Sequence, residues 1–324
     1  MRLVRVELTR FRSRRAVVLM LLAAGILAAV LAGATILETR PVSAADQAAA
    51  QAMADAEADQ PYVRQELARC QRNPERYGGR AFDAAGCEGL VVPQPDWFLQ
   101  RSTLSLHEER TDSGLATIII VCAIMVIVGT TFAGADWASG SVSNQLLFEP
   151  RRLKVWLAKS AAVVVATLVT SVLIVAGFWL ALYVAAEARD IATPVSALEQ
   201  IAWLSLRGVA LSALGALGGF ALTMLVRHTV GTLAVMFVYS VGGEALTAAL
   251  PFPGVARLSL VNNLFAWLLD GHEYYDSSIN CDAGQNMCDQ TALLTLSEGA
   301  TYLAILLLVV VFASMVSFLR RDVP

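Results

Sequence analysis

Residues 136–159 read DWASGSVSNQLLFEPRRLKVWLAK and separate two long apolar runs, at 115–135 and 160–186. Each run exceeds the ~18 apolar residues that indicate a transmembrane helix. The whole chain is 56% hydrophobic and only 16% charged, with a mean hydropathy of +0.59. Soluble domains carry more charge than this. The sequence therefore predicts an all-α, polytopic membrane protein in which a polar segment connects two spans.

The polar segment itself has the pattern of a short helix beside the membrane. Asp136 precedes it, where an acid can cap the N-terminus and complement the helix dipole. Pro150 is expected to end the helix. An apolar face is predicted from Val142, Leu146, Leu147 and Leu153. Positive charge next to the membrane comes from Arg151, Arg152, Lys154 and Lys159. From charge alone, the segment would read as an ordinary basic loop.

The spacing of particular residues favours a more specific interpretation. The frame consists of Asp136, Gly140, Ser141, Leu146, Leu147, Pro150, Arg152 and Lys159. It resembles the cytoplasmic loop of type-2 ABC transporter permeases, the membrane subunits of exporters for antibiotics, polysaccharides and lipids. That family's loop has an acid, Gly-Thr, a Leu pair, Pro, Arg and Lys in this order. Here Asp replaces the more usual Glu, and Ser the more usual Thr. The resemblance implies a short helix that docks on a separate ATPase.

The sequence lacks a phosphate-binding motif, which agrees with ATP hydrolysis by a separate partner. The chain contains no Gly-x-x-x-x-Gly-Lys-Ser/Thr motif to cradle phosphates, and its two lysines both lie in the central segment. We predict no catalytic residues, no metal site and no cofactor in this chain. The resemblance places ATP and Mg on the partner ATPase and implies a second permease subunit, either identical or related. No basic stripe with interleaved aromatics supports nucleic-acid binding.

The apolar runs and the resemblance together divide the chain. The expected parts are an amphipathic elbow helix at 1–15, a first span at 16–37, an extracytoplasmic subdomain at 38–113, spans two to five within 114–250, an outer loop at 251–297, and a sixth span with a cytoplasmic tail at 298–324. The first segment carries six arginines and suits either an interfacial helix or a plain basic flank. A secretory signal peptide competes with the first span, but the apolar run is longer than the ~7–15 residues of a signal h-region.

Basic residues and cysteines predict the orientation. The expected inner segments are short yet hold over half of the 24 Lys and Arg residues, which places both termini in the cytoplasm of a bacterial cell. Four cysteines then fall outside, where disulfides persist. The simplest pairing is Cys70–Cys87 and Cys281–Cys288, although four cysteines permit three connectivities. Within the outer loop, residues 255–269 are apolar but short, which indicates a helix at the interface or a re-entrant one.

Two charges are expected inside spans, where a charge is costly. Arg207 in the fourth span and Glu244 in the fifth would each lie roughly 9–10 Å below the outer boundary. Because consecutive antiparallel helices are usually neighbours, we predict an Arg207–Glu244 pair, either a structural tie or a substrate or gating contact. The alternative is that the two side chains snorkel apart without pairing. Gly215 and Gly219 form a Gly-x-x-x-Gly motif that allows close helix contact.

The resemblance implies a permease that moves a hydrophobic or amphipathic substrate, a drug or a lipid, outward through the bilayer. Two other classes compete with it. A membrane sensor or structural subunit would use the disulfide-bearing outer loops to bind a ligand or partner. An ion-coupled secondary transporter would show inverted repeats and several buried carboxylates, and the sequence shows neither.

Overall fold

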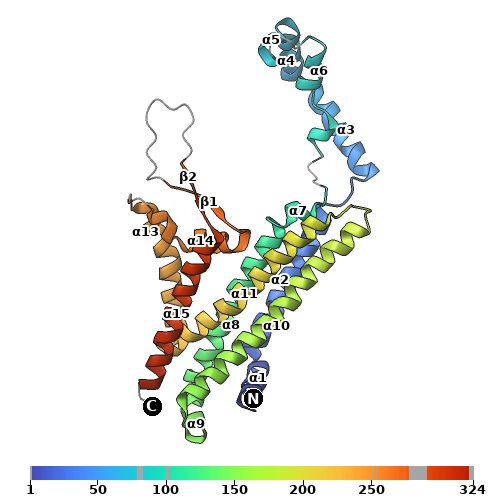
Figure 1. The fold of residues 1–324 in the computed structure, drawn as a ribbon. Coiled ribbons are helices and arrows are strands. Elements are labelled where there is room, and N and C mark those ends of the chain that lie inside the picture. The colour runs from blue at the N-terminus through green and yellow to red at the C-terminus, as the bar shows by residue number, and fades with distance from the viewer. Residues whose placement is uncertain are drawn as a thin grey trace. The chain divides into compact units, whose positions relative to one another are not determined.

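The computed structural model describes residues 2–78, 83–99, 103–250, 252, 254–276 and 290–320 (Figure 1). Within these residues, six helices are long and apolar enough to cross a membrane. They are α2 (Arg15–Glu38), α7 with α8 (Leu106–Glu109 and Ser113–Ala138), α10 (Arg152–Glu187), α11 (Val195–Val226), α12 with η2 and α13 (Thr229–Phe237, Val238–Gly242 and Gly243–Ala249), and α15 (Leu296–Arg320). The chain is thus a multi-pass, predominantly α-helical membrane protein, which confirms the predicted fold class in outline.

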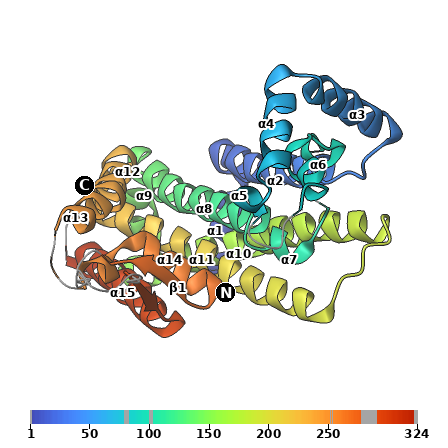
Figure 2. The same ribbon diagram turned by 90° about the horizontal axis from the view of Figure 1, so that it is seen from above.

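The chain forms two compact units, one of residues 1–32 with 106–324 and the other of residues 33–105. In the first unit, α8, α10 and α11 lie side by side (Figures 1 and 2). The N-terminal helix α1 (Arg2–Ser13) packs against α10. The core of this unit gathers side chains from α1, α8, α10, α11 and α15, with the largest being Phe11, Phe132, Trp156, Phe220 and Phe318.

The contact between α8 and α11 depends on glycine. A Cβ added to Gly129 of α8 would lie 2.0 Å from the carbonyl oxygen of Ala216 on α11, and one added to Gly219 would lie 2.5 Å from that of Val126. A Cβ added to Gly215, the other glycine of the predicted motif, would lie 2.9 Å from a methyl carbon of Val126. Small residues let the two backbones approach. The Gly-x-x-x-Gly motif therefore packs α11 against α8 of the same chain.

A tight turn at Arg227 and His228 joins α11 to α12. Arg227 adopts a left-handed conformation with φ of 64°, which terminates α11. The Nδ1 atom of His228 accepts a hydrogen bond from the backbone N–H of Gly231, at 3.1 Å. This bond satisfies one of the free N–H groups at the start of α12. Two spans can therefore follow each other with only this turn between them.

The segment before the last span is more structured than the sequence predicts. The apolar stretch at 255–269 is a 3₁₀ turn, η3 (Val255–Leu258), and a separate helix α14 (Leu260–Leu269), whose N-cap Ser259 accepts from the N–H of Asn262. After it, β1 (His272–Tyr275) and β2 (Thr291–Leu294) form an antiparallel pair with His272 opposite Leu294. Nothing in an all-α prediction anticipates this hairpin, because four-residue strands are too short to show a two-residue period.

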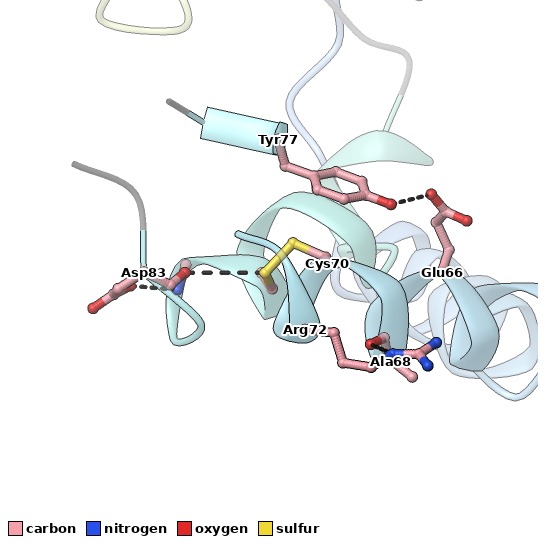
Figure 3. The surroundings of a disulfide bond; sticks show 8 residues. Glu66, Ala68, Cys70, Arg72, Tyr77 and Asp83 are labelled. Atoms are coloured by element: carbon pink, nitrogen blue, oxygen red, sulfur yellow. Dashed lines mark hydrogen bonds between the residues drawn. A yellow bond between two sulfur atoms is a disulfide. The ribbon is translucent and has the colours of Figure 1, made fainter. Parts of the chain in front are cut away.

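The second unit is helical and contains the predicted Cys70–Cys87 disulfide (Figure 3). Its elements are α3 (Ala44–Ala58), α4 (Pro61–Arg72), α5 (Glu75–Gly78), α6 (Gly86–Val91) and the 3₁₀ turn η1 (Pro95–Trp97). Ser43 forms a capping box with Asp46 at the start of α3. Both cysteines are fully buried, and the bond joins α4 to α6. The second predicted pair, Cys281–Cys288, lies outside the described residues.

Replacing Cys70 and Cys87 together with alanine is expected to destabilise residues 33–105 by about 3 kcal/mol, because the cross-link restricts the unfolded chain. The two cysteines are 17 residues apart. Limited proteolysis of the purified protein measures the change, with new cleavage sites expected within 33–105. Cys122→Ala serves as a control, since Cys122 is a free thiol of α8. Equal protease resistance of the double variant and the parent protein would contradict this expectation.

Candidate functional site

The polar segment between the second and third spans forms the predicted short helix. This helix, α9, covers Ser141–Phe148 and follows Gly140, whose φ of 64° turns the chain sharply after α8. A left-handed residue is the conformation that glycine adopts most readily. The chain then passes through Glu149 and the exposed Pro150 before α10 begins at Arg152. The frame found in the sequence therefore brackets one helix between two long spans.

At the base of α9 lies a cluster of buried charges, here called the Lys159 cluster, formed by Glu7, Asp136 and Lys159. Lys159 of α10 is fully buried and its Nζ lies 3.0 Å from Glu7 Oε2 and 2.6 Å from Asp136 Oδ2. The two carboxylates are also buried, with side-chain exposures of 0% and 1%. One ammonium group thus joins α1, α8 and α10. A buried charge is tolerated only when it is paired in this way.

Neighbouring polar groups complete the cluster. Arg14, at the junction of α1 and α2, makes an ion pair with Asp136 Oδ1, and Ser141 Oγ donates to the same oxygen at 2.7 Å. Gln145 of α9 donates from Nε2 to Glu7 Oε1 at 2.7 Å. Arg10, which is partly exposed, reaches Glu7 Oε1 at 3.4 Å and Gln145 Oε1 at 3.2 Å. Every oxygen of the two carboxylates therefore accepts at least one bond.

An aromatic ring covers the apolar side of the cluster. Phe132 of α8 is fully buried, and the Lys159 ammonium lies 5.7 Å from its ring centroid. The guanidinium of Arg14 lies 5.2 Å from the same centroid, and Phe11 packs on the ring at 5.2 Å. Cations are attracted to the face of an aromatic ring. The arrangement keeps water away and holds α1 firmly against α8 and α10.

The opposite side of α9 is apolar and exposed. Leu147 is 80% exposed and Phe148 is 91% exposed. By contrast, Val142 is fully buried and Leu146 packs against the hydrophobic core. The single apolar face predicted for this helix is therefore divided in two. Val142 and Leu146 pack against the rest of the chain, and Leu147 and Phe148 are exposed. Phe148, which the sequence frame did not include, is the most exposed of these side chains.

The remaining frame residues fix the flanks of α9. Arg152 donates to the backbone carbonyls of Phe318 and Leu319, at 3.3 and 3.4 Å, near the end of α15. The role predicted for Asp136 needs correction. No side chain caps the N-terminus of α9, and the Asp136 carboxylate instead binds Arg14, Ser141 and Lys159. Its charge is used within the Lys159 cluster, where the attraction to two cations exceeds that of a helix dipole.

Sequence reasoning missed Glu7. It is fully buried at the centre of the cluster, although the N-terminal segment was predicted to present only apolar and basic faces. Two signals point to it. Glu7 is the single acid among residues 1–15, and it lies four residues before Phe11, on the same helical face. An isolated acid on the apolar side of a basic helix indicates a buried partner.

The predicted Arg207–Glu244 pair does not form. An Nη atom of Arg207 lies 3.1 Å from Oδ1 of Asp270, the residue that follows α14. Glu244 accepts from the hydroxyl of Ser259 at 2.8 Å and from the N–H of Val261 at 2.9 Å. The free N–H groups and positive dipole at the start of α14 attract the Glu244 carboxylate. Each charge therefore finds its partner in the segment after the fifth span.

Among the described residues, no group of three or more His, Cys, Asp or Glu side chains could hold a metal ion. Comparison of the chain with protein-family models, with curated proteins and with solved structures finds no match. The candidate site is therefore defined by its own geometry. It is a short helix with an exposed apolar tip, and its base is hydrogen-bonded to a cluster of buried ion pairs that joins α1, α8 and α10.

Proposed function

We propose that the chain is the membrane-spanning permease subunit of an ABC exporter. The observation that carries this proposal is α9, whose Leu147 and Phe148 are exposed while its base is hydrogen-bonded to α8 and to α1. An exposed apolar tip on a helix between two spans suits contact with another protein, because burying large apolar side chains lowers the free energy. The partner in this proposal is a separate ATPase subunit, which carries ATP and Mg.

The Lys159 cluster connects α9 mechanically to the membrane-spanning helices. ATP-driven closure of the ATPases would press on α9, and the Asp136–Ser141 and Glu7–Gln145 bonds would pass the force to α8 and α1. Lys159 connects both to α10. A rigid link between two such elements is what coupling requires. In this arrangement α1 is the elbow helix on the inner leaflet, and both termini lie in the cytoplasm of a bacterial cell.

The transporter in this proposal contains two permease subunits, as a homodimer or with a related chain. Few of the apolar side chains on α12–α13 and on α15 are buried in the single chain, which leaves surface for lipid and for a second subunit. The substrate would pass between the subunits and move outward. Few charges lie within the spans, which favours a hydrophobic or amphipathic substrate such as a drug or lipid.

A second candidate function rests on the disulfide-linked unit at residues 33–105. A membrane sensor or structural subunit would use this unit to bind a ligand or partner outside the membrane, without transport. The cross-linked helices α4 and α6 favour such a role, because a rigid binding surface loses less entropy on association. This function needs no ATPase beneath α9, which is the point on which the two candidates differ.

Replacing Leu147 and Phe148 together with aspartate is expected to abolish co-purification of an ATPase encoded by an adjacent reading frame, because two charges cannot enter an apolar contact. Detergent-solubilised permease is isolated through a tag, and the ATPase that accompanies it is quantified. Both side chains are exposed, so the permease itself should fold and elute as the parent protein does. Leu146→Asp is unsuitable for this test, because Leu146 packs against the core.

Asn144→Asp provides the matched control, since Asn144 is an exposed polar residue of the same helix. It adds a charge to α9 without altering the apolar tip, and it should leave the complex intact. Retention of the ATPase by the Leu147/Phe148 double variant would refute the proposed contact. Absence of any ATPase that co-purifies with the parent protein would instead favour the sensor.

A further inference from the structure

A second site lies at the other end of the bundle from α9. An open pocket of about 250 Å³ is formed by the first part of α11, by Arg110 between α7 and α8, and by the end of α14. The indole of Trp267 on α14 donates to the carbonyl of Arg207 on α11 at 3.0 Å, which holds the two helices together. This bond joins two walls of the pocket without using a charged side chain.

The pocket contains more positive than negative charge. Arg110 and Arg207 both line it, and Asp270 is the one acid among its lining residues. Asp270 pairs with Arg207 at 3.1 Å, while the Nε of Arg110 is buried and has no hydrogen-bond partner among the described residues. A buried donor without an acceptor is costly, and few remain so in native proteins. An anion in the pocket would supply the acceptor that this Nε lacks.

Apart from Gln200, the other side chains that line the pocket are apolar. Trp203 and Leu204 line it from α11, and Leu268 lines it from α14. Trp203 is 53% exposed, and Leu206 beside it is 59% exposed, so the apolar wall continues outward onto the surface of the span. A ligand that satisfies both parts must combine an anionic group with a hydrocarbon portion.

We propose that this pocket binds an anionic amphiphile, with a phosphate, sulfate or carboxylate group between Arg110 and Arg207 and an acyl or alkyl chain along Trp203. Guanidinium groups bind such anions through paired N–H donors. The site is independent of the proposed transport function, since neither α9 nor an ATPase takes part. The same chemistry could come from a membrane lipid or from a water-soluble anion, and the two differ in whether the hydrocarbon part contributes.

Asp270 has the properties of an internal competitor for Arg207. It is 64% exposed and sits at the C-terminus of α14 with φ of 68°. Its carboxylate occupies one guanidinium that the ligand would use, so the ligand must displace it. Asparagine tolerates the same left-handed conformation and keeps the same shape without the charge. Asp270→Asn therefore removes the competing charge and preserves the turn.

The test measures binding of phosphatidylglycerol to the full chain in nanodiscs of zwitterionic lipid, by native mass spectrometry. Arg110→Gln is expected to weaken binding about tenfold or more, as loss of a charge-assisted contact does. Asp270→Asn is expected to tighten binding several-fold. The control is Arg189→Gln, an arginine beyond the end of α10 that does not line the pocket; it should bind as the parent protein does.

Two further arms identify the source of the anion. An alkyl sulfate should compete with phosphatidylglycerol, and Trp203→Ala should weaken both, if the hydrocarbon part is bound. Competition by inorganic phosphate alone, unaffected by Trp203→Ala, would overturn the amphiphile in favour of a free anion. Unchanged phosphatidylglycerol binding in both Arg110→Gln and Asp270→Asn would overturn the site, as would equal binding of phosphatidylcholine. Arg110→Gln and Asp270→Asn are expected to change the affinity in opposite directions. This separates binding from a structural role, because the loss of a stabilising ion pair would not by itself tighten ligand binding.

Discussion

Replacing Lys159 with methionine is expected to destabilise the protein by about 3–5 kcal/mol, the cost of leaving buried charge without its partner. Glu7 would lose its closest cation, and Asp136 would keep only Arg14 and Ser141. The variant should unfold at a markedly lower temperature than the parent protein. Fluorescence-detected size exclusion of heated, detergent-solubilised samples measures this shift.

The chain provides a matched control, because its other lysine lies on the same helix. Lys154 is exposed near the start of α10, and Lys154→Met should leave stability nearly unchanged. Combining Lys159→Met with Glu7→Gln should recover most of the loss, because the carboxylate left unpaired becomes a neutral amide while Asp136 retains Arg14. Equal unfolding temperatures for the two lysine variants, or a double variant less stable than Lys159→Met alone, would contradict the cluster as the origin of the effect.

The sequence frame identified much of this site, since Asp136, Ser141 and Lys159 were selected by their spacing and lie within hydrogen-bonding distance in the structure. What spacing alone does not contain is their partner. Glu7 is distant in the chain, and its contact with Lys159 depends on how α1 packs against α10. A periodicity argument assigns residues to the faces of a single helix, so it does not determine which helix covers that face.

The same limit explains the errors at the other end of the bundle. The six spans were predictable, because a continuous apolar run is sufficient to identify a transmembrane helix. The partners of Arg207 and Glu244 were not, because both come from the segment after the fifth span, which the sequence described only as an interfacial or re-entrant helix. The rotation of each helix about its axis decides which charge faces which neighbour, and apolar composition does not encode that rotation.

Replacing Gly129 with alanine is expected to be strongly destabilising, because among the described glycines of the spans its added Cβ comes closest to a backbone atom. The added Cβ would lie 2.0 Å from the carbonyl oxygen of Ala216, so α8 and α11 would have to move apart. Overpacking of this kind costs typically about 1–3 kcal/mol and occasionally more. Because this crossing also aligns Phe132 of α8 with the core, we expect a lower unfolding temperature together with a weakened Lys159 cluster.

Gly177→Ala is the control that separates this clash from a general intolerance of larger residues. Gly177 lies on α10, and nothing lies within 4 Å of a Cβ built there. Alanine at that position should be neutral or stabilising by up to ~1 kcal/mol, since it favours a helix over glycine. Thermal unfolding of the two alanine variants should therefore shift in opposite directions or differ strongly in size. Similar shifts would contradict a close α8–α11 crossing at Gly129, because a methyl group that meets no neighbour has no reason to destabilise the bundle.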